Sequence, residues 1–210
     1  MSNDTPENPG STVAAVEIIT EGQGIIGNCR GLNERLRLVD LLNNPEIIHL
    51  QLADVKVRQL LSSREVIAAD GPMFIDKASV VLGRSRASPE EEARRNEAHR
   101  FDHVQKEKQL MLVFAPPFRI QGNIHIIKDA DLTVVLPKLF EGFLAITEAK
   151  TIHEAECGLA WDDEFIVVNG RHIEMVCVVP PGYRQVQLAG ARPAAKVEER
   201  DAQQVSSAVE

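Results

Sequence analysis

The most constraining feature of this sequence is a pattern that occurs twice. Residues 24–29 match residues 119–124, so that the dipeptide Gly27-Asn28 returns as Gly122-Asn123, 95 residues later. Apolar positions before and after this dipeptide return in the same order, at intervals that drift from 95 to 93 residues. The matched sets are Val16, Ile18 and Ile19 with Met111, Val113 and Phe114; Leu38, Leu41 and Leu42 with Leu132, Val135 and Leu136; residues 50–56 with 144–150; and Phe74, Ile75, Val80 and Leu82 with Val167, Val168, Ile173 and Met175. A fixed order of elements at near-constant spacing indicates an internal duplication.

Within each copy the apolar residues mostly alternate or form short runs, which favours strands, and one i, i+3, i+4 group favours a short helix. Each copy therefore predicts strand–strand–helix–strand–strand. A unit of this size buries too little surface to be stable alone, so we expect the two copies to share a core about a pseudo-two-fold axis. The predicted fold class is β-rich α+β: two tandem ββαββ units, each a small barrel or bent sheet. Pro137 falls within the second short helix, which it limits to one turn unless the helix begins there.

Between the copies the pattern changes to that of a charged helix. Ser88-Pro89 precedes Glu91, which matches an N-cap, an N1 proline and an acidic N3 residue. Glu90 and Arg94 add an i, i+4 pair in the favourable order. The predicted organisation is a disordered tail over 1–11, a first repeat over 12–83, a linker helix over 84–107, a second repeat over 108–183 and a disordered tail over 184–210.

Charge and composition narrow the classes of function. The net charge is −8, with only one Trp, one Tyr and seven Phe, so the chain lacks the cationic and aromatic surface that nucleic-acid binding generally uses. No apolar run approaches the length of a membrane span, and the first ten residues lack the features of a signal peptide. Three scattered cysteines predict reduced, buried thiols rather than a disulfide framework. We therefore expect a soluble, cytoplasmic protein.

Four short blocks carry a resemblance to a known group of proteins: residues 37–43 (RLVDLLN), 50–55 (LQLADV), 143–149 (FLAITEA) and 167–173 (VVNGRHI). They resemble the RLSDxLN, FLxLTDA and VNRxHI signatures of an uncharacterised family of small bacterial β-domain proteins. That family has no assigned activity, so the resemblance implies a fold and no site residue. A small bent sheet of this kind is also similar to Sm-like barrels, which would imply RNA binding.

Several motifs suggest a site, and each also has a structural interpretation. Residues 22–27 match GxGxxG, but the residues that follow continue as a strand and not as the helix of a dinucleotide site, so a hairpin turn explains the glycines better. His99 and His103 stand one turn apart on the linker helix and lack a third metal ligand. Cys157, in a loop-like stretch, is the strongest candidate for a reactive thiol.

Two polar clusters in the second copy are the candidate sites. Asp162, Asp163 and Glu164 form an acidic group that we place in a turn before a strand starting at Phe165, and they are the candidate cation ligands. Asn169, Arg171, His172 and Glu174 alternate with apolar neighbours, which predicts an exposed strand face that contacts a partner or ligand.

No catalytic set converges in the sequence and no cofactor is predicted. The leading hypothesis is therefore a non-catalytic scaffolding or protein-interaction module that acts through sheet edges, forms oligomers or joins a larger complex, and binds neither membrane nor nucleic acid. The alternative is a small-molecule-binding or metal-binding regulator or enzyme, with a pocket at the seam between the two repeats.

Overall fold

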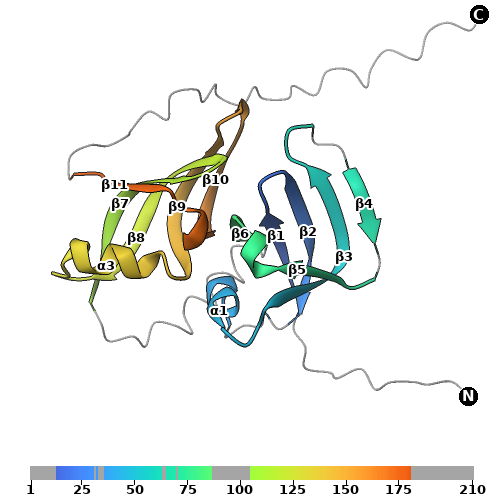
Figure 1. Ribbon diagram of the computed structural model, residues 1–210, viewed down its shortest axis with the longest axis horizontal. Coiled ribbons are helices and arrows are strands. Elements are labelled where there is room, and N and C mark those ends of the chain that lie inside the picture. The colour runs from blue at the N-terminus through green and yellow to red at the C-terminus, as the bar shows by residue number, and fades with distance from the viewer. Residues whose placement is uncertain are drawn as a thin grey trace, which may run out of the picture.

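The fold is described from a computed structural model covering residues 13–30, 32, 36–62, 65–69, 71–86 and 105–180. These residues form a β-rich protein with an antiparallel sheet and, among the described segments, two α-helices (Figure 1). Residues 13–86 are called the N-terminal half and residues 105–180 the C-terminal half below. No helix in these segments is both long and apolar enough to cross a membrane. The predicted tails and most of the predicted linker helix lie outside the described residues.

The described residues of the N-terminal half form six strands, one α-helix and a 3-10 turn. Their bounds are β1 (Val13–Ile19), β2 (Gln23–Arg30), α1 (Leu38–Asn43), β3 (His49–Gln59), β4 (Glu65–Ala69), β5 (Met73–Asp76), η1 (Lys77–Ser79) and β6 (Leu82–Ser85). The last strand predicted in the first copy, around Phe74, Ile75, Val80 and Leu82, is two strands in the structure, β5 and β6. It is divided because the Asp76 carboxylate accepts a hydrogen bond from the backbone N–H of Ala78, which starts the 3-10 turn.

The C-terminal half contains five strands, one α-helix and a second 3-10 turn. Their bounds are β7 (Lys106–Ala115), β8 (Phe118–Ile127), α3 (Leu132–Leu139), β9 (Phe143–His153), β10 (Glu156–Asn169), η2 (Gly170–His172) and β11 (Met175–Val178). Lys106 and Glu107 begin β7, so the predicted linker boundary at 107 is too late. Helix α3 also runs through Pro137, so it is longer than the single turn that we expected.

The eleven strands of the described segments belong to one continuous sheet. The strand order is β11-β7-β8-β9-β10-β6-β1-β2-β3-β4, and β5 also pairs with β3. Strands β6 and β10 form the seam between the halves, with Val167 opposite Gly83 and Val168 opposite Leu82. The sheet ends with β4 on one side of the molecule and β11 on the other (Figure 1).

Two apolar clusters lie within the bends of this sheet, and each takes side chains from both halves. The first is built mainly from the N-terminal half and includes Val167, with Phe143 and Phe165 packed against it. The second is built mainly from the C-terminal half and includes Ile19 and Leu82. The two halves therefore complete each other's interior, as the small size of each one requires.

The glycine of each repeated Gly-Asn dipeptide sits where the neighbouring strand comes close. At Gly122 an added Cβ would collide with Ile146 and lie 3.0 Å from the carbonyl oxygen of Thr147. At Gly27 it would lie 3.0 Å from the carbonyl oxygen of Ala53. Both glycines lie within register shifts, between Ile26 and Asn28 in one half and between Gln121 and Asn123 in the other. Each glycine therefore permits a bulge that bends its sheet.

Replacing Gly122 with alanine should destabilise the fold, because the new methyl group has no room beside backbone atoms. We expect Gly122→Ala to lower the free energy of unfolding by about 1–3 kcal/mol. Gly22→Ala is the matched control, because nothing lies within 4 Å of a Cβ added at Gly22. Urea titrations of both variants would measure the difference, and equal midpoints would contradict this account of the bulge.

Candidate functional site

A buried carboxylate on β1 is the centre of the most concentrated group of charges in the described structure. Glu17 is fully buried, and its Oε1 atom accepts a hydrogen bond of 2.6 Å from Nη2 of Arg58. Its Oε2 atom accepts a hydrogen bond of 2.8 Å from Nε of Arg84 and a further one from Arg86. Arg84 also donates to both carboxylate oxygens of Asp163 on β10, at 3.0 and 3.2 Å. The charge network therefore joins β1, β3 and β6 of one half to β10 of the other.

Local strand geometry brings these side chains together. Glu17 stands directly opposite Arg84 in the pairing of β1 with β6. Arg58 reaches Glu17 from β3 by crossing β2 at Gly24, where an added Cβ would lie 3.1 Å from Nε of Arg58 and 3.4 Å from Oε1 of Glu17. Gly24 therefore leaves room for the Arg58 side chain.

The arginines decide the ionisation of Glu17. Burial by itself would raise the pKa of this carboxyl, but the charge of Arg84, together with the hydrogen bonds and charges of Arg58 and Arg86, holds the pKa below its ordinary value of 4.5. Glu17 is therefore an anion at neutral pH. Its role is electrostatic, because an isolated buried arginine would be strongly destabilising.

An aromatic group adjoins the network on the side of the C-terminal half. The guanidinium of Arg84 lies 5.0 Å from the ring centroid of Trp161, a cation–π distance. Phe118 contacts both Trp161 and His153 edge-on, with ring centroids at 5.9 and 5.3 Å. Buried polar atoms without a hydrogen-bond partner gather in the same area: Nε1 of Trp161, Oγ1 of Thr151, Nδ1 of His153 and Nε of Arg58.

The acidic group predicted to bind a cation is not assembled. Asp162, Asp163 and Glu164 lie within β10 and not in a turn, because that strand begins at Glu156. Side chains alternate between the faces of a strand, so Asp162 and Glu164 are exposed while Asp163 turns inward to Arg84. Across the described segments, no group of three His, Cys, Asp or Glu side chains is placed to hold a metal ion.

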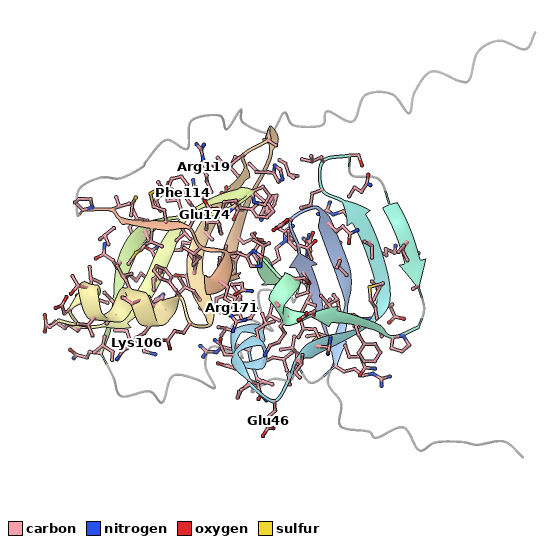
Figure 2. The ribbon with its side chains drawn as sticks, viewed as in Figure 1. Glu46, Lys106, Phe114, Arg119, Arg171 and Glu174 are labelled. Atoms are coloured by element: carbon pink, nitrogen blue, oxygen red, sulfur yellow. The ribbon has the colours of Figure 1, made fainter. Side chains whose placement is uncertain are left out.

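The polar residues predicted to share an exposed strand face do not share one. Residues 170–172 form the turn η2, and Asn169 is buried with its side-chain amide donating to the carbonyl oxygen of Val80 at 2.9 Å. The Nε2 atom of His172 lies 3.0 Å from the carbonyl oxygen of Ala78. Arg171 and Glu174 are exposed and lie apart on the surface (Figure 2). Asn169 and His172 therefore stabilise the seam between the halves.

The remaining motifs have structural roles or lie outside the described residues. Residues 22–27 form a turn and strand β2, as the hairpin interpretation predicts, and each of the three glycines has a different environment. Cys29 is buried, and burial raises the pKa of its thiol to about 11, which disfavours a reactive thiolate. Cys177 is exposed, contrary to the prediction of three buried thiols. The side chain of Cys157 and the pair His99 and His103 lie outside the described set.

The two ends of the sheet carry apolar side chains on the surface. On β11, Met175 is 49% exposed and Val178 is also exposed. On the opposite end, Phe74 of β5 is 63% exposed and Ile67 of β4 is exposed. In the described structure β11 pairs with β7 alone, and β4 and β5 pair with β3 alone. Both edges therefore offer backbone groups and apolar side chains to another strand.

Neutralising Glu17 should destabilise the protein, because Arg84 would remain buried without its strongest partner. We expect Glu17→Gln to lower the free energy of unfolding by about 3 kcal/mol. Glu154→Gln is the matched control. It removes an exposed pair with Arg119 and should change stability by less than about 1 kcal/mol. A comparable loss in both variants would show that the buried network is no more important than a surface pair.

The lowered pKa of Glu17 also predicts how stability depends on pH. A group whose pKa is lower in the folded than in the unfolded state stabilises the fold above its unfolded value, and this stabilisation is lost as the pH falls through the folded value. As the pH falls from about 4.5, the stability difference between the native chain and Glu17→Gln should therefore shrink. Thermal or urea unfolding at several acidic pH values would measure it, and a constant difference would contradict the assignment.

No protein-family model matches the sequence, and neither the curated proteins nor the solved structures include a significant match. The resemblance to the uncharacterised family of β-domain proteins therefore stays a prediction.

Proposed function

We propose that this chain is a non-catalytic protein-interaction module, made from two copies of one ancestral unit, that binds partners by adding strands to its open sheet edges. The observation that carries the proposal is the pair of edges at β11 and at β4 with β5. Among the residues that the structure describes, each edge combines unpaired strand backbone with exposed apolar side chains. Such an edge recognises an extended segment through main-chain hydrogen bonds and alternate side-chain contacts.

Equivalent strand registers in the two halves support the duplication. Ile18 stands opposite Gly83 in the N-terminal half, and Val113 stands opposite Val176 in the C-terminal half. These residues are related by the same intervals, 95 and 93, that relate the repeated sequence patterns. The register shifts after Ile26 and after Gln121 also fall at matching positions.

The bulges share their chemistry as well as their position. Asn28 donates a side-chain hydrogen bond to Asp54 at 2.7 Å, and Asn123 donates one to Glu148 at 2.9 Å. The two acidic residues are 94 positions apart and both have a positive φ, 52° and 51°. A left-handed non-glycine residue is uncommon, so its recurrence at matched sites supports common descent.

We propose a non-catalytic function because the buried polar residues Glu17, Arg84 and Asn169 already have structural partners. Glu17, Arg84 and Asp163 neutralise one another across the seam, and Asn169 holds η1. These groups are therefore engaged in contacts that join the two halves. The edges, in contrast, present apolar side chains and backbone.

Charged substitutions at the edges should abolish partner binding and leave the fold intact. We expect Phe74→Arg and Met175→Arg each to reduce recovery of cross-linked partners from native lysate at least tenfold, because a buried unpaired charge costs several kcal/mol. Ile127→Arg is the matched control, since Ile127 is 57% exposed and lies outside both edges. Quantitative cross-linking mass spectrometry would measure recovery. Equal recovery from all three variants, or cross-links that avoid both edges, would contradict the proposal.

A second candidate function is the binding of a small molecule at the seam. The specific observation in its favour is the gathering of unpartnered polar atoms on Trp161, Thr151 and His153 beside the charge network. Buried polar atoms are normally satisfied, so such a group can mark a ligand site. Native mass spectrometry and metal analysis of the purified chain would test it. A stoichiometric adduct lost in Trp161→Phe would support this function, and a mass equal to that of the chain alone would reject it.

A further inference from the structure

At the seam between the halves, strand β10 of the C-terminal half covers the edge strand β6 of the N-terminal half. Strand β10 lies beside β6, with Val167 opposite Gly83 and Val168 opposite Leu82, and the backbone N–H of Asn169 donates to the carbonyl oxygen of Val81 at 2.9 Å. Val167 points into the apolar cluster of the N-terminal half. A Cβ added to Gly83 would lie 3.3 Å from Cδ2 of Leu38, so this position faces the same interior.

The two α-helices differ in burial. Helix α1 packs in a cluster that a strand of the other half completes, and α3 has no such strand among the described residues. All four apolar residues of α1 are buried in a cluster that takes in β10: Leu38, Val39, Leu41 and Leu42. Helix α3 occupies the corresponding place in the C-terminal half, and none of its residues is buried. Leu132, Val135, Leu136 and Leu139 are only partly buried there, and Val134 is 55% exposed. Within the described residues, the interior of the C-terminal half therefore lacks the strand that covers the interior of the N-terminal half.

We propose that a second copy of this chain supplies that cover, by placing its β5 beside β11 in the register that β10 adopts beside β6. This inference rests on the proposed function, because it names the partner of the same edges. The repeat intervals assign the register. Phe74 and Ile75 correspond to Val167 and Val168, and Val176 and Met175 correspond to Gly83 and Leu82. Phe74 of one copy then lies opposite Val176 of the next and enters the interior beside α3.

The side chains that flank the two outer edges differ in polarity from those at the seam within the chain. The seam within the chain carries Arg84, Asp163 and Trp161. Strand pairing places Cys177, Ala69 and Ile67 at the matching positions of the outer edges. These three positions carry no charge, whereas β11 in place of β6 would leave the carboxylate of Asp163 without its arginine partner. The charges therefore favour β5 as the partner of β11 and disfavour exchange with the inner seam.

Two polar contacts of the inner seam have no counterpart at the outer edges. The Asn169 amide, which donates to the carbonyl oxygen of Val80, is matched by the carboxylate of Asp76, which has no proton to donate. Asn43, which bonds both the N–H and the carbonyl oxygen of Phe143, is matched by Pro137. The contact between copies should therefore be weaker than the seam and reversible.

The contact joins two different surfaces, so it is head-to-tail. Each copy offers β11, at one end of the strand order, to one neighbour, and β5, which pairs with β3 near the other end, to another. Such heterologous contacts produce a closed ring when the rotation between copies closes, and an open filament when it does not.

Light scattering across a protein concentration series tests the association. The full chain should form assemblies larger than a monomer, and Phe74→Arg and Val176→Pro should each raise the concentration needed for assembly by about tenfold or more. Val176→Pro removes a backbone N–H at the outer edge, where proline is compatible with a strand. Ile127→Arg should assemble as the native chain does. Circular dichroism and urea unfolding would establish that each variant is folded.

Disulfide formation between two populations tests the register and the polarity. Phe74→Cys and Val176→Cys are prepared separately, each with Cys157→Ser and Cys177→Ser, and then oxidised apart and together. A covalent dimer should form only in the mixture, because directly opposite residues have Cβ atoms close enough to bridge. Dimers within either unmixed population would show a symmetric contact and overturn the inference.

A chain that stays monomeric at every concentration would also overturn the inference. The proposed function would survive that result if Phe74→Arg and Met175→Arg still lost cross-links to a different protein. Loss of self-association in the edge variants, together with the mixed disulfide, would support both proposals.

Discussion

The structure depends on one buried interaction, the contact of Glu17 with Arg84. Glu17 comes from the middle of β1 and Arg84 from the strand beside it, and Arg84 continues to Asp163 in the other half. Burying a carboxylate is unfavourable unless cations surround it, and each cation in turn requires an anion. The alternation of charges from Arg58 through Glu17 and Arg84 to Asp163 meets that condition only when β6 and β10 lie side by side. The network thereby specifies how the halves are joined, while the apolar clusters supply most of the driving force.

The same seam explains why residues typical of sites prove to be structural. An acidic pair, an asparagine and a histidine lie between positions 162 and 172 of the C-terminal half, and such residues often mark catalytic or binding sites. Here Asp163 neutralises Arg84, while Asn169 and His172 meet backbone carbonyl oxygens of the first half. Where β6 and β10 meet, the turns beside them leave backbone N–H and C=O groups without strand partners. Polar side chains such as those of Asn169 and His172 form hydrogen bonds with these groups. Polar residues of the C-terminal half therefore satisfy backbone groups of the N-terminal half.

Much of the element order could be predicted, because periodicity and spacing are local properties. Alternating apolar residues identified the strands, and the i, i+3, i+4 spacing of Leu38, Leu41 and Leu42 identified α1. The recurring Gly-Asn dipeptide pointed to a special backbone site, and both glycines prove to lie where strands approach closely. The division of the last strand predicted in the N-terminal half into β5 and β6 was missed, because it depends on a hydrogen bond from the backbone N–H of Ala78 to the Asp76 carboxylate. A turn was wrongly assigned to Asp162 and Asp163, because two adjacent acidic residues are typical of turns. In the structure they belong to β10, and Asp163 points inward to Arg84.

The sequence by itself determined the β-rich character, the position of the short helices and the interval between recurring elements, all of which follow from local patterns of apolar residues. Only the tertiary structure decided that β6 and β10 meet, that Glu17 is fully buried, and that β5 and β11 are left at open edges. The physical reason is that a buried charge looks like any other charge in a sequence. Its partners, Arg58 and Arg84, lie 41 and 67 residues away, and only the folded sheet brings them within hydrogen-bonding distance.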